Sequence, residues 1–446
     1  WQQDEQYEAK VTDTWPQRTL FTTKSLRFNP GSSDYLNRTL SAGNNKTWTF
    51  SAWIKKNSSG SNYPRILGLY IDANDYLRLN FNREADGEQL HLYYEVSGTA
   101  STLLTNRLFR DFSAWYHIVV SVNTTLGTAD DRLKIYVNGV QETSFATRTN
   151  PSQDSTTPLN NNGDVLLIGK KEGASSDYYN GYMSEVILVD GQALDPTSFG
   201  VANSDGVWTP IPYTGTFGTN GFNLQFENSA ALGTDSSPNG NTFTVNNLTS
   251  IDQSTDYPEV NFTTWNPLAN FNNTLTFSEG NLKGIANSSS NPWFSARANI
   301  GFTSGKWFWE TKFTGSTDPV PAYIGVVDES AALNINDAHN ANGNTLYYNG
   351  SGGEMRVDGS STSNDYGNFS TSDICGVAVN ADDNLITIYK NGSAIITNYA
   401  LSTTRTGFLF PTAAATNTSS GTNSNGLITN FGSPPFAISS GNTDGN

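Results

Sequence analysis

Short runs in which hydrophobic and polar residues alternate follow one another along most of this chain, separated by turn-forming residues. An alternation with period two predicts a β-strand with one buried face, because successive side chains of a strand point to opposite sides. The clearest runs are 47–56, 65–71, 76–83, 89–96, 115–122, 164–170, 182–191, 305–313 and 322–329. Since no run of ten or more residues has the spacing of an amphipathic helix, the pattern predicts an all-β protein.

One hairpin pattern occurs twice, at 116–139 and at 374–392. In each copy an apolar strand leads into a turn that contains Asp-Asp, and a second alternating strand ends in Tyr, one further residue and Asn-Gly. Asn-Gly favours a reversal with positive φ, which both residues tolerate at low cost. The two copies predict two domains of one broad architecture, each a sandwich of antiparallel sheets.

The length of 446 residues is large for a single hydrophobic core, so two or three domains are expected. Residues 1–22 are polar and lack alternation, and we interpret them as an N-terminal arm or tether. The first sandwich is expected at 23–200 and a connector with some strand at 201–256. The second sandwich, with a polar C-terminal tail, is expected at 257–446.

The chain has 25 basic and 41 acidic residues and a formal charge of −16. Such a surface repels phosphate backbones, which argues against nucleic acid as a partner. No segment approaches the roughly 18 consecutive apolar residues of a membrane span, so membrane insertion is not expected. The single cysteine, Cys375, excludes an intrachain disulfide, and its place on the apolar face of a predicted strand favours a buried structural thiol.

The spacing of carboxylates that suits glycoside hydrolysis occurs once, as Glu84, Asp86 and Glu88. A retaining mechanism needs two carboxyl groups about 5 Å apart, and residues at alternate positions of one strand share a face. Asp86 is followed by glycine, however, and Asp-Gly favours a hairpin turn that would spread these carboxylates into solvent. The three histidines lie far apart, and no Cys-x-x-Cys, His-Glu-x-x-His or nucleophile-elbow motif occurs. The sequence therefore predicts a protein that is not an enzyme.

Two segments near the ends of the first predicted sandwich, 25–56 and 180–200, resemble the laminin-G-like, concanavalin A-type domain of marine bacteriophage virion proteins. The most specific part is the closing stretch NGYMSEVILVDGQALDPTSFG. Residues 305–313 (GKWFWETKF), 322–329 and 374–392 resemble a SPRY domain. Both families have jelly-roll folds, so the resemblance implies two concanavalin A-like jelly-roll β-sandwiches in tandem.

Pairs of adjacent tyrosines are the candidates for contact with a glycan or protein ligand. Adjacent residues of a strand face opposite ways, so one ring of each pair is expected to point outward. The alternative is that these rings cover sandwich edges or an inter-subunit contact. The pairs are Tyr93 and Tyr94, Tyr178 and Tyr179, and Tyr347 and Tyr348.

Laminin-G-like domains often bind calcium at the rim of the sandwich, and the resemblance therefore implies calcium as a candidate cofactor. Oxygen ligands of the kind that calcium prefers occur in two loops, at Asp72, Asn74 and Asp75 and at Asp130 and Asp131. Asp and Asn are also ordinary hairpin residues, so both interpretations stay open. No other cofactor is expected.

The resemblance implies a non-enzymatic structural protein of a phage virion, as a tail fibre, a tail-associated component or a capsid-surface component. Its β-sandwiches would serve host-surface attachment or subunit contacts. The expected partners are other virion proteins, a homo-oligomer that the resemblance implies to be a trimer, and a host cell-surface glycan or protein. Such a protein is assembled in the host cytoplasm and exposed on the virion. The alternative is a secreted bacterial adhesin or polysaccharide-binding protein at the cell surface.

Overall fold

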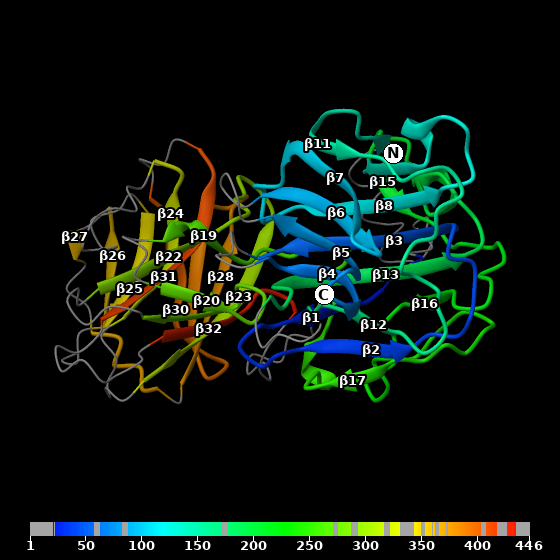
Figure 1. The fold of residues 1–446 in the computed structure, drawn as a ribbon. Helices are drawn as coiled ribbons and strands as arrows, with labels where there is room; N and C mark the ends of the chain where they lie inside the picture. Colours follow the sequence, from blue (N-terminus) through cyan, green and yellow to red (C-terminus); the bar gives the residue numbers. More distant parts are fainter. Residues whose placement is uncertain are drawn as a thin grey trace.

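The computed structural model describes residues 21, 23–57, 63–82, 88–171, 177–270, 275–286, 293–315, 322–330, 343–348, 353–358, 360–361, 365–371, 373–402, 407–416 and 426–433. These residues form antiparallel strands and three short 3-10 helices, and this part of the chain contains no α-helix. The prediction of an all-β fold is confirmed. Figure 1 shows the two bodies, with the earlier part of the chain on the right and the later part on the left.

The first sandwich has two eight-stranded sheets, of which the first is called the β3–β13 sheet here. In spatial order it consists of β10 (Val140–Gln141), β9 (Leu133–Val137), β8 (Trp115–Asn123), β3 (Thr47–Lys56), β13 (Gly181–Asp190), β1 (Ser25–Phe28) and β18 (Gln253–Ser254), with β16 (Phe222–Leu224) also paired to β13.

The facing sheet, called the β5–β6 sheet here, runs from β11 at the top to β17 at the bottom of the right-hand body in Figure 1. Its strands in order are β11 (Phe145–Thr149), β7 (Thr99–Leu108), β6 (Gln89–Val96), β5 (Asp75–Asn82), β4 (Arg65–Asp72), β12 (Val165–Ile168), β2 (Tyr35–Thr39) and β17 (Thr244–Asn246). A small sheet of β14 (Gly200–Ala202) and β15 (Trp208–Pro210) and the helices η1 (Ala129–Asp131), η2 (Pro196–Ser198) and η3 (Ser250–Asp252) complete this body.

One hydrophobic core lies between these two sheets. Phe50 and Ile54 of β3 face Leu79 of β5 and Leu92 of β6 across it, and all four are at most 1% exposed. Full burial of such a side chain contributes about 1.5–3 kcal/mol. The alternating residues of the predicted strands therefore hold the sandwich together as expected.

The outer face of the β3–β13 sheet is also covered, so β3 and β13 are buried on both faces. Ile187 and Val189 of β13 pack outward against Phe199 and Phe217 of the segment that follows this strand. A second apolar cluster contains Trp53, which is 3% exposed. Neither face of these strands therefore meets water, although the alternation at 47–56 and 182–191 predicts one wet face.

The segment 201–256, expected as a connector, contributes strands to both sheets of the first sandwich. β16 pairs with β13, β18 pairs with β1, and β17 pairs with β2 of the other sheet. Through these pairings the segment lies against the first sandwich along much of its length.

The second sandwich consists of two seven-stranded sheets. The first has β19 (Trp265–Asn270), β22 (Trp293–Ala298), β31 (Leu409–Thr416), β24 (Ala322–Asp328), β25 (Gly343–Tyr348), β26 (Gly353–Val357) and β27 (Ser360–Ser361), and the second has β20 (Leu275–Ser278), β21 (Lys283–Ala286), β32 (Gly426–Asn430), β23 (Lys306–Thr314), β28 (Ile374–Asn380), β29 (Leu385–Lys390) and β30 (Ser393–Ala400). Cys375 of β28 is fully buried in the core between them, and burial raises the pKa of its thiol. This burial agrees with the expected structural role.

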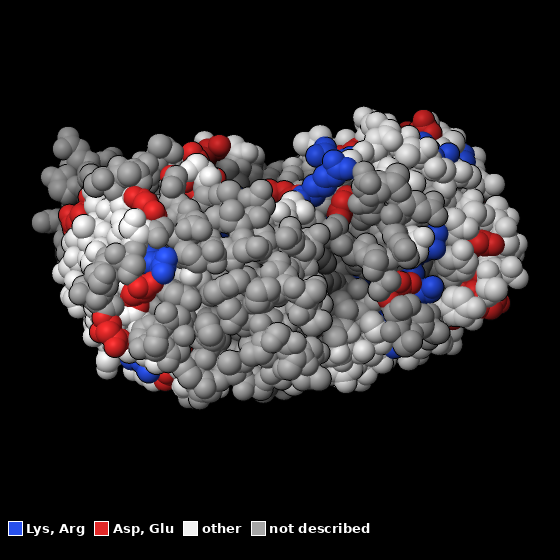
Figure 2. All heavy atoms as spheres, turned by 90° about the vertical axis from the view of Figure 1, so that its left-hand side faces the viewer, with Lys and Arg blue, Asp and Glu red and all other residues white. Residues whose placement is uncertain are grey.

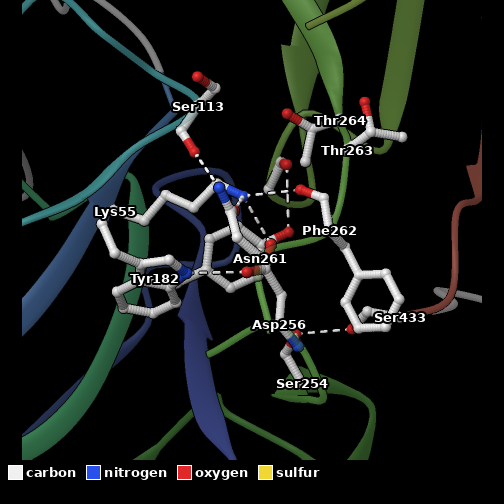
Figure 3. A network of polar contacts seen from close by, with 12 residues as sticks. Lys55, Ser113, Tyr182, Ser254, Asp256, Asn261, Phe262, Thr263, Thr264 and Ser433 are labelled. Carbon is white, nitrogen blue, oxygen red and sulfur yellow. Dashed lines mark hydrogen bonds and ion pairs between the residues drawn. The ribbon is translucent and has the colours of Figure 1, made fainter. Parts of the chain in front are cut away.

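The two sandwiches meet through a network of buried polar contacts, shown in Figure 3. The ammonium of Lys55, at the end of β3, donates to Asp256 at 2.7 Å, to Asn261 at 2.7 Å and to the carbonyl of Phe262 at 2.9 Å. The other carboxylate oxygen of Asp256 accepts a hydrogen bond from the indole of Trp115 at 2.9 Å. Lys55 and Asp256 are at most 1% exposed, and all three donors of the ammonium have acceptors.

Further contacts cross the same junction. The hydroxyl of Tyr182 donates to the carbonyl of Gly280 at 3.1 Å, and the hydroxyls of Ser254 and Ser433 lie 2.6 Å apart (Figure 3 labels Tyr182, Ser254 and Ser433). Arg27, which is 1% exposed, lies 3.5 Å from the carboxylate of Glu279. The junction is therefore buried and hydrogen-bonded, unlike a flexible linker.

Candidate functional site

The outer face of the β5–β6 sheet carries a row of polar and aromatic side chains on its central strands. Thr102 pairs with Tyr93, Tyr93 pairs with Arg78, and Arg78 pairs with Gly68. Directly paired residues of antiparallel strands project from the same face. The chain neighbours of this row are core residues on the opposite face, namely Leu67, Leu79, Leu92 and Leu103.

Three tyrosines form a ladder on this face, one from each of β4, β5 and β6. The ring centroids of Tyr70 and Tyr76 are 6.4 Å apart, and those of Tyr76 and Tyr93 are 5.4 Å apart at an interplanar angle of 20°. The hydroxyl of Tyr93 donates to the carboxylate of Glu95 at 2.9 Å. Tyr70 is 45% exposed at the end of the ladder. The rings are thus held in place by one another, and one of them is open to solvent.

Two arginines lie beside the ladder. The guanidinium carbon of Arg78 is 4.5 Å from the ring centroid of Tyr93, a cation–π distance. Arg65 donates to the amide oxygen of Asn80 at 3.0 Å and is 4% exposed. Its aliphatic stem crosses Gly68, where an added Cβ would lie 3.3 Å from the Cγ of Arg65. Because Gly68 pairs with Arg78, this path brings the two arginine side chains together.

His91 lies next to these cations. Its Nε2 is 2.8 Å from the hydroxyl of Thr102, and its ring meets that of Tyr93 edge-on at 5.8 Å. Burial, followed by the charges of Arg78 and Arg65, lowers the pKa of His91 to about 4. The imidazole is therefore neutral at neutral pH and adds no further charge to the face.

The first two tyrosine pairs are split between the core and the surface. Tyr94 is 2% exposed in the core between the sheets, and Tyr179 is fully buried with its hydroxyl 3.2 Å from the carbonyl of Lys55. Their assignment as ligand contacts is corrected, because both side chains are enclosed in the hydrophobic core and cannot reach a ligand. Their partners Tyr93 and Tyr178 are half-buried at the surface.

Tyr178 lies apart from the tyrosine ladder. Its ring is 6.5 Å from that of Tyr35, and the ammonium of Lys170 lies over both rings, at 4.2 Å from Tyr35 and 5.6 Å from Tyr178. Of the third pair, the structure describes only the backbone, in β25: Tyr347 pairs with Tyr323 and Tyr348 pairs with Ala322. The side chains of this pair lie outside the described part of the chain.

The calcium candidates of the first loop form the turn between β4 and β5. Asp72 accepts a hydrogen bond from the backbone amide of Asn74 at 2.7 Å, and Asp75 accepts one from the amide of Ser97 at 3.0 Å. These contacts are ordinary for hairpin residues. The oxygens cap amide groups and are not gathered around a common point by any contact that we observe.

The second calcium candidate has cationic and amide partners. Asp130 lies 3.1 Å from Arg148 and accepts a hydrogen bond from Asn150 at 2.7 Å, and Asp131 lies 3.0 Å from Lys134. Within the described ranges, no group of three or more His, Cys, Asp and Glu side chains is placed to hold a metal ion. Calcium binding stays a prediction.

Of the carboxylates in the hydrolase-like spacing, Glu84 and Asp86 lie outside the described residues. Glu88 is 2% exposed and forms a buried ion pair with Lys56. Lys56 also lies 4.2 Å over the ring of Phe81, and burial lowers the pKa of its ammonium to about 7. Glu88 thus ties the two sheets together from inside the sandwich.

A polar depression of about 490 Å³ opens at another part of the first sandwich, beside Asn44, Asp190 and Thr219. The carboxylate of Asp190 accepts hydrogen bonds from the backbone amides of Asn44 at 2.8 Å and Asn220 at 3.0 Å. It also accepts one from the side chain of Asn160 at 3.1 Å. This carboxylate therefore orders three loop segments and has little capacity left for a ligand.

Acidic and basic side chains are dispersed on the face in Figure 2, where the described residues show small groups of either sign rather than one broad basic area. This distribution fits the overall charge of −16. Helices that are long and apolar enough to cross a membrane are absent from the described ranges.

Two family models match the chain in succession. Residues 30–198 match the concanavalin A-like lectin/glucanases superfamily, and residues 306–428 match the SPRY domain. The prediction of these two domain types, in this order, is confirmed. The matches do not concern the source of the chain, so a phage origin stays a prediction. No curated protein matches the chain.

Solved structures with similar folds cover half of the chain or less. The chain is similar to a putative carbohydrate binding protein from Bacteroides ovatus at 17% identity, over 50% of this chain and 58% of that chain, with a TM-score of 0.34. It is similar to the SPRY domain of human HERC1 at 16% identity, over 37% of this chain and 96% of that chain, with a TM-score of 0.30. Similarities of this size carry no inference about what the chain binds.

Proposed function

We propose that this chain, which carries a concanavalin A-like domain followed by a SPRY domain, is a non-enzymatic carbohydrate-binding protein. Its binding surface is the outer face of the β5–β6 sheet. The observation that carries the proposal is the ladder of Tyr70, Tyr76 and Tyr93 with Arg78 stacked on its inner end.

The chemistry of the ladder suits a sugar. A pyranose presents apolar C–H groups and a dense set of hydroxyls, and tyrosine offers an apolar ring and a polar tip at a low entropic cost. Glu95, Thr102 and Arg78 add hydrogen-bonding groups of both kinds within the same patch. Because the rings pack on one another before any ligand arrives, little conformational freedom is lost on binding.

The other faces of the first sandwich support this choice. The outer face of the β3–β13 sheet is occupied by the chain itself, at the apolar clusters around Phe199 and Trp53. The depression at Asp190 has its carboxylate satisfied internally. The β5–β6 sheet is therefore the face on which aromatic and charged side chains meet solvent together.

The biological setting that we propose is a structural protein of a phage virion that attaches to a host-surface glycan or contacts other virion subunits. The sequence resemblance to phage virion proteins supports this setting. A secreted bacterial adhesin or polysaccharide-binding protein uses the same surface chemistry and is the second candidate. Mass spectrometry of purified virions and of culture supernatants separates them, since the first predicts the chain in particles and the second predicts it free or on cells.

Binding is tested with a polysaccharide panel in affinity electrophoresis. Tyr70→Ala and Tyr93→Ala are expected to weaken retardation by the polysaccharide that binds the unaltered protein. Trp307→Ala is the control, because Trp307 is 42% exposed, much as Tyr70 is at 45%, but belongs to the second sandwich. Equal retardation of all variants, or no retardation of the unaltered protein by any polysaccharide, would refute the proposal.

A further inference from the structure

Arg78 and Arg65 form a pair of like charges on the tyrosine-bearing face. They occupy adjacent strands, and the stem of Arg65 lies over Gly68, the residue paired with Arg78. Burial and the neighbouring charge of Arg78 lower the pKa of Arg65 to about 10, so Arg65 remains cationic at neutral pH. Two adjacent guanidinium groups repel each other, and such an arrangement is normally balanced by an anion.

The balancing charge within the protein is small. Among the described residues, no carboxylate lies within 4 Å of the guanidinium nitrogens of Arg78 or Arg65. Asp177 acts on Arg65 from a longer range, but its carboxylate is engaged by Lys171 at 3.5 Å and by the amide of Tyr63 at 3.2 Å. The Nε of Arg78 is buried and has no hydrogen-bond acceptor.

The neighbours of Arg78 hold its guanidinium without neutralising it. The ring of Tyr93 supports one side at 4.5 Å, and His91 beside it is neutral. An arginine fixed in this way keeps a rigid fork of donors, which matches the two oxygens of a carboxylate or a sulfate. Less side-chain freedom is then lost when such a group binds.

The acidic composition of the chain does not explain this arginine pair. Acidic residues exceed basic ones by 16, so a cationic pair without a close carboxylate is unusual for this surface. At physiological ionic strength charges are screened over about 8 Å, so the local pair and not the distant negative charge governs an anion at this face.

We propose that Arg78, with the charge of the buried Arg65 beside it, binds an anionic group, a carboxylate or a sulfate ester, of an acidic polysaccharide whose sugar rings lie on the tyrosine ladder. This inference rests on the proposed carbohydrate-binding function and deepens it. The sugar contacts Tyr70 and Tyr93, whereas the charged substituent reaches Arg78, and Arg65 adds its positive charge from the buried side.

The test uses the full chain and isothermal titration with short oligosaccharides of alginate, of dextran sulfate and of unmodified dextran. Alginate carries carboxylates and dextran sulfate carries sulfate esters, so the two arms identify the anion. We expect one of them to bind, and Arg78→Gln to weaken that binding by about ten-fold or more. Lys46→Gln is the control, since this lysine is 38% exposed on another part of the first sandwich, and it should change affinity by less than about two-fold.

A second measurement needs no polysaccharide and does not require Arg65 to be replaced. The pKa of His91 is followed by NMR in the presence and absence of inorganic sulfate. An anion bound at Arg78 favours the protonated imidazole, so sulfate should raise the pKa of His91 in the unaltered protein and much less in Arg78→Gln. Sodium chloride at equal ionic strength controls for screening.

The outcomes distinguish a failure of the anion site from a failure of the proposed carbohydrate-binding function. If unmodified dextran binds as tightly as the charged oligosaccharides and Arg78→Gln has no effect, the anion site is wrong although the ladder binds sugar. If no oligosaccharide binds and sulfate leaves the pKa of His91 unchanged, both proposals fail. If Arg78→Gln instead dissociates an oligomer in sedimentation, the anion is a carboxylate of a second copy, and the polysaccharide site is again overturned.

Discussion

The indole Nε1 of Trp208 donates a hydrogen bond to Nδ1 of His117 over 2.9 Å, and this single contact determines the tautomer of the histidine. Because Nδ1 accepts, the proton of the neutral ring is on Nε2, which lies 2.8 Å from the hydroxyl of Ser51. The imidazole is stacked on Trp53, with ring centroids 4.7 Å apart, and the ring of Trp208 lies beside it at 6.1 Å with an interplanar angle of 23°. Full burial lowers the pKa of His117 to about 3.

His117 is therefore expected to make the protein less stable in mild acid. The unfolded chain binds a proton near pH 6.5 and the folded chain near pH 3, so the free energy of unfolding falls as the pH is lowered through this interval. His117→Phe removes this proton linkage and two hydrogen bonds, and should cost about 1–3 kcal/mol at pH 7. Urea denaturation from pH 7 to pH 5 checks both effects. A variant with the same pH slope as the unaltered protein would contradict the assignment.

The indole of Trp208 also explains why position 200 is occupied by glycine, which the sequence alone does not explain. A Cβ on Gly200 would lie 2.6 Å from the indole of Trp208, so Gly200→Ala must displace the ring from His117. Overpacking of this kind costs about 1–3 kcal/mol. The comparison is Gly127→Ala, where an added Cβ meets no atom within 4 Å. Thermal denaturation of both variants should show a lower melting temperature for Gly200→Ala, with little change at Gly127.

The buried pair at the junction predicts a strongly asymmetric response. Lys55→Met leaves the carboxylate of Asp256 buried without its cation and should cost about 3–5 kcal/mol. Lys55→Met combined with Asp256→Leu removes both charges and should recover part of this loss. Differential scanning calorimetry makes the measurement, and we expect Lys55→Met to separate the unfolding of the two sandwiches into distinct transitions. A double variant as unstable as the sum of its single variants would argue against direct coupling.

Tyr93 and Tyr94 are adjacent in the chain, but replacing Tyr94 should mainly lower stability, whereas replacing Tyr93 should mainly impair binding. Tyr94 is 2% exposed in the core, so Tyr94→Ala is expected to destabilise the fold by about 3–5 kcal/mol. Tyr93 stands on the surface ladder, so Tyr93→Ala should cost about 1 kcal/mol in stability and yet impair glycan binding. Urea denaturation combined with affinity electrophoresis tests the pair. Loss of binding in proportion to stability for both variants would remove the distinction.

The sequence predicted the strands well because alternation is a local property. It expected one ring of each tyrosine pair to point outward without indicating which, and the structure places Tyr94 and Tyr179 in the core. Tyr70 lies beside Tyr76 and Tyr93 because of the register in which β4, β5 and β6 pair. The hairpins determine this register, and a local pattern of alternation does not reveal it. The face on which Arg65 lies was hidden for a second reason, since the register shifts between Arg65 and Leu67.

Burial on both sides of a sheet was equally invisible in the local pattern. The alternation in β3 and β13 predicts one wet face, but the segment after β13 folds back and covers it at Phe199 and Phe217. Which of two sheets stays free for a ligand is therefore decided by contacts between segments far apart in the chain. The candidate site could be located only after those contacts were known.

The junction at Lys55 and Asp256 would affect how the whole molecule binds a polymer of repeating units. A hinge would let the proposed sugar-binding surface move independently of the second sandwich, whereas a buried, hydrogen-bonded junction would hold the two sandwiches at one angle. In an assembly of several copies, the binding faces would then be held at fixed distances from one another. Avidity for a polymer would depend on whether its repeat matches those intervals, because no slack in the joint compensates for a mismatch.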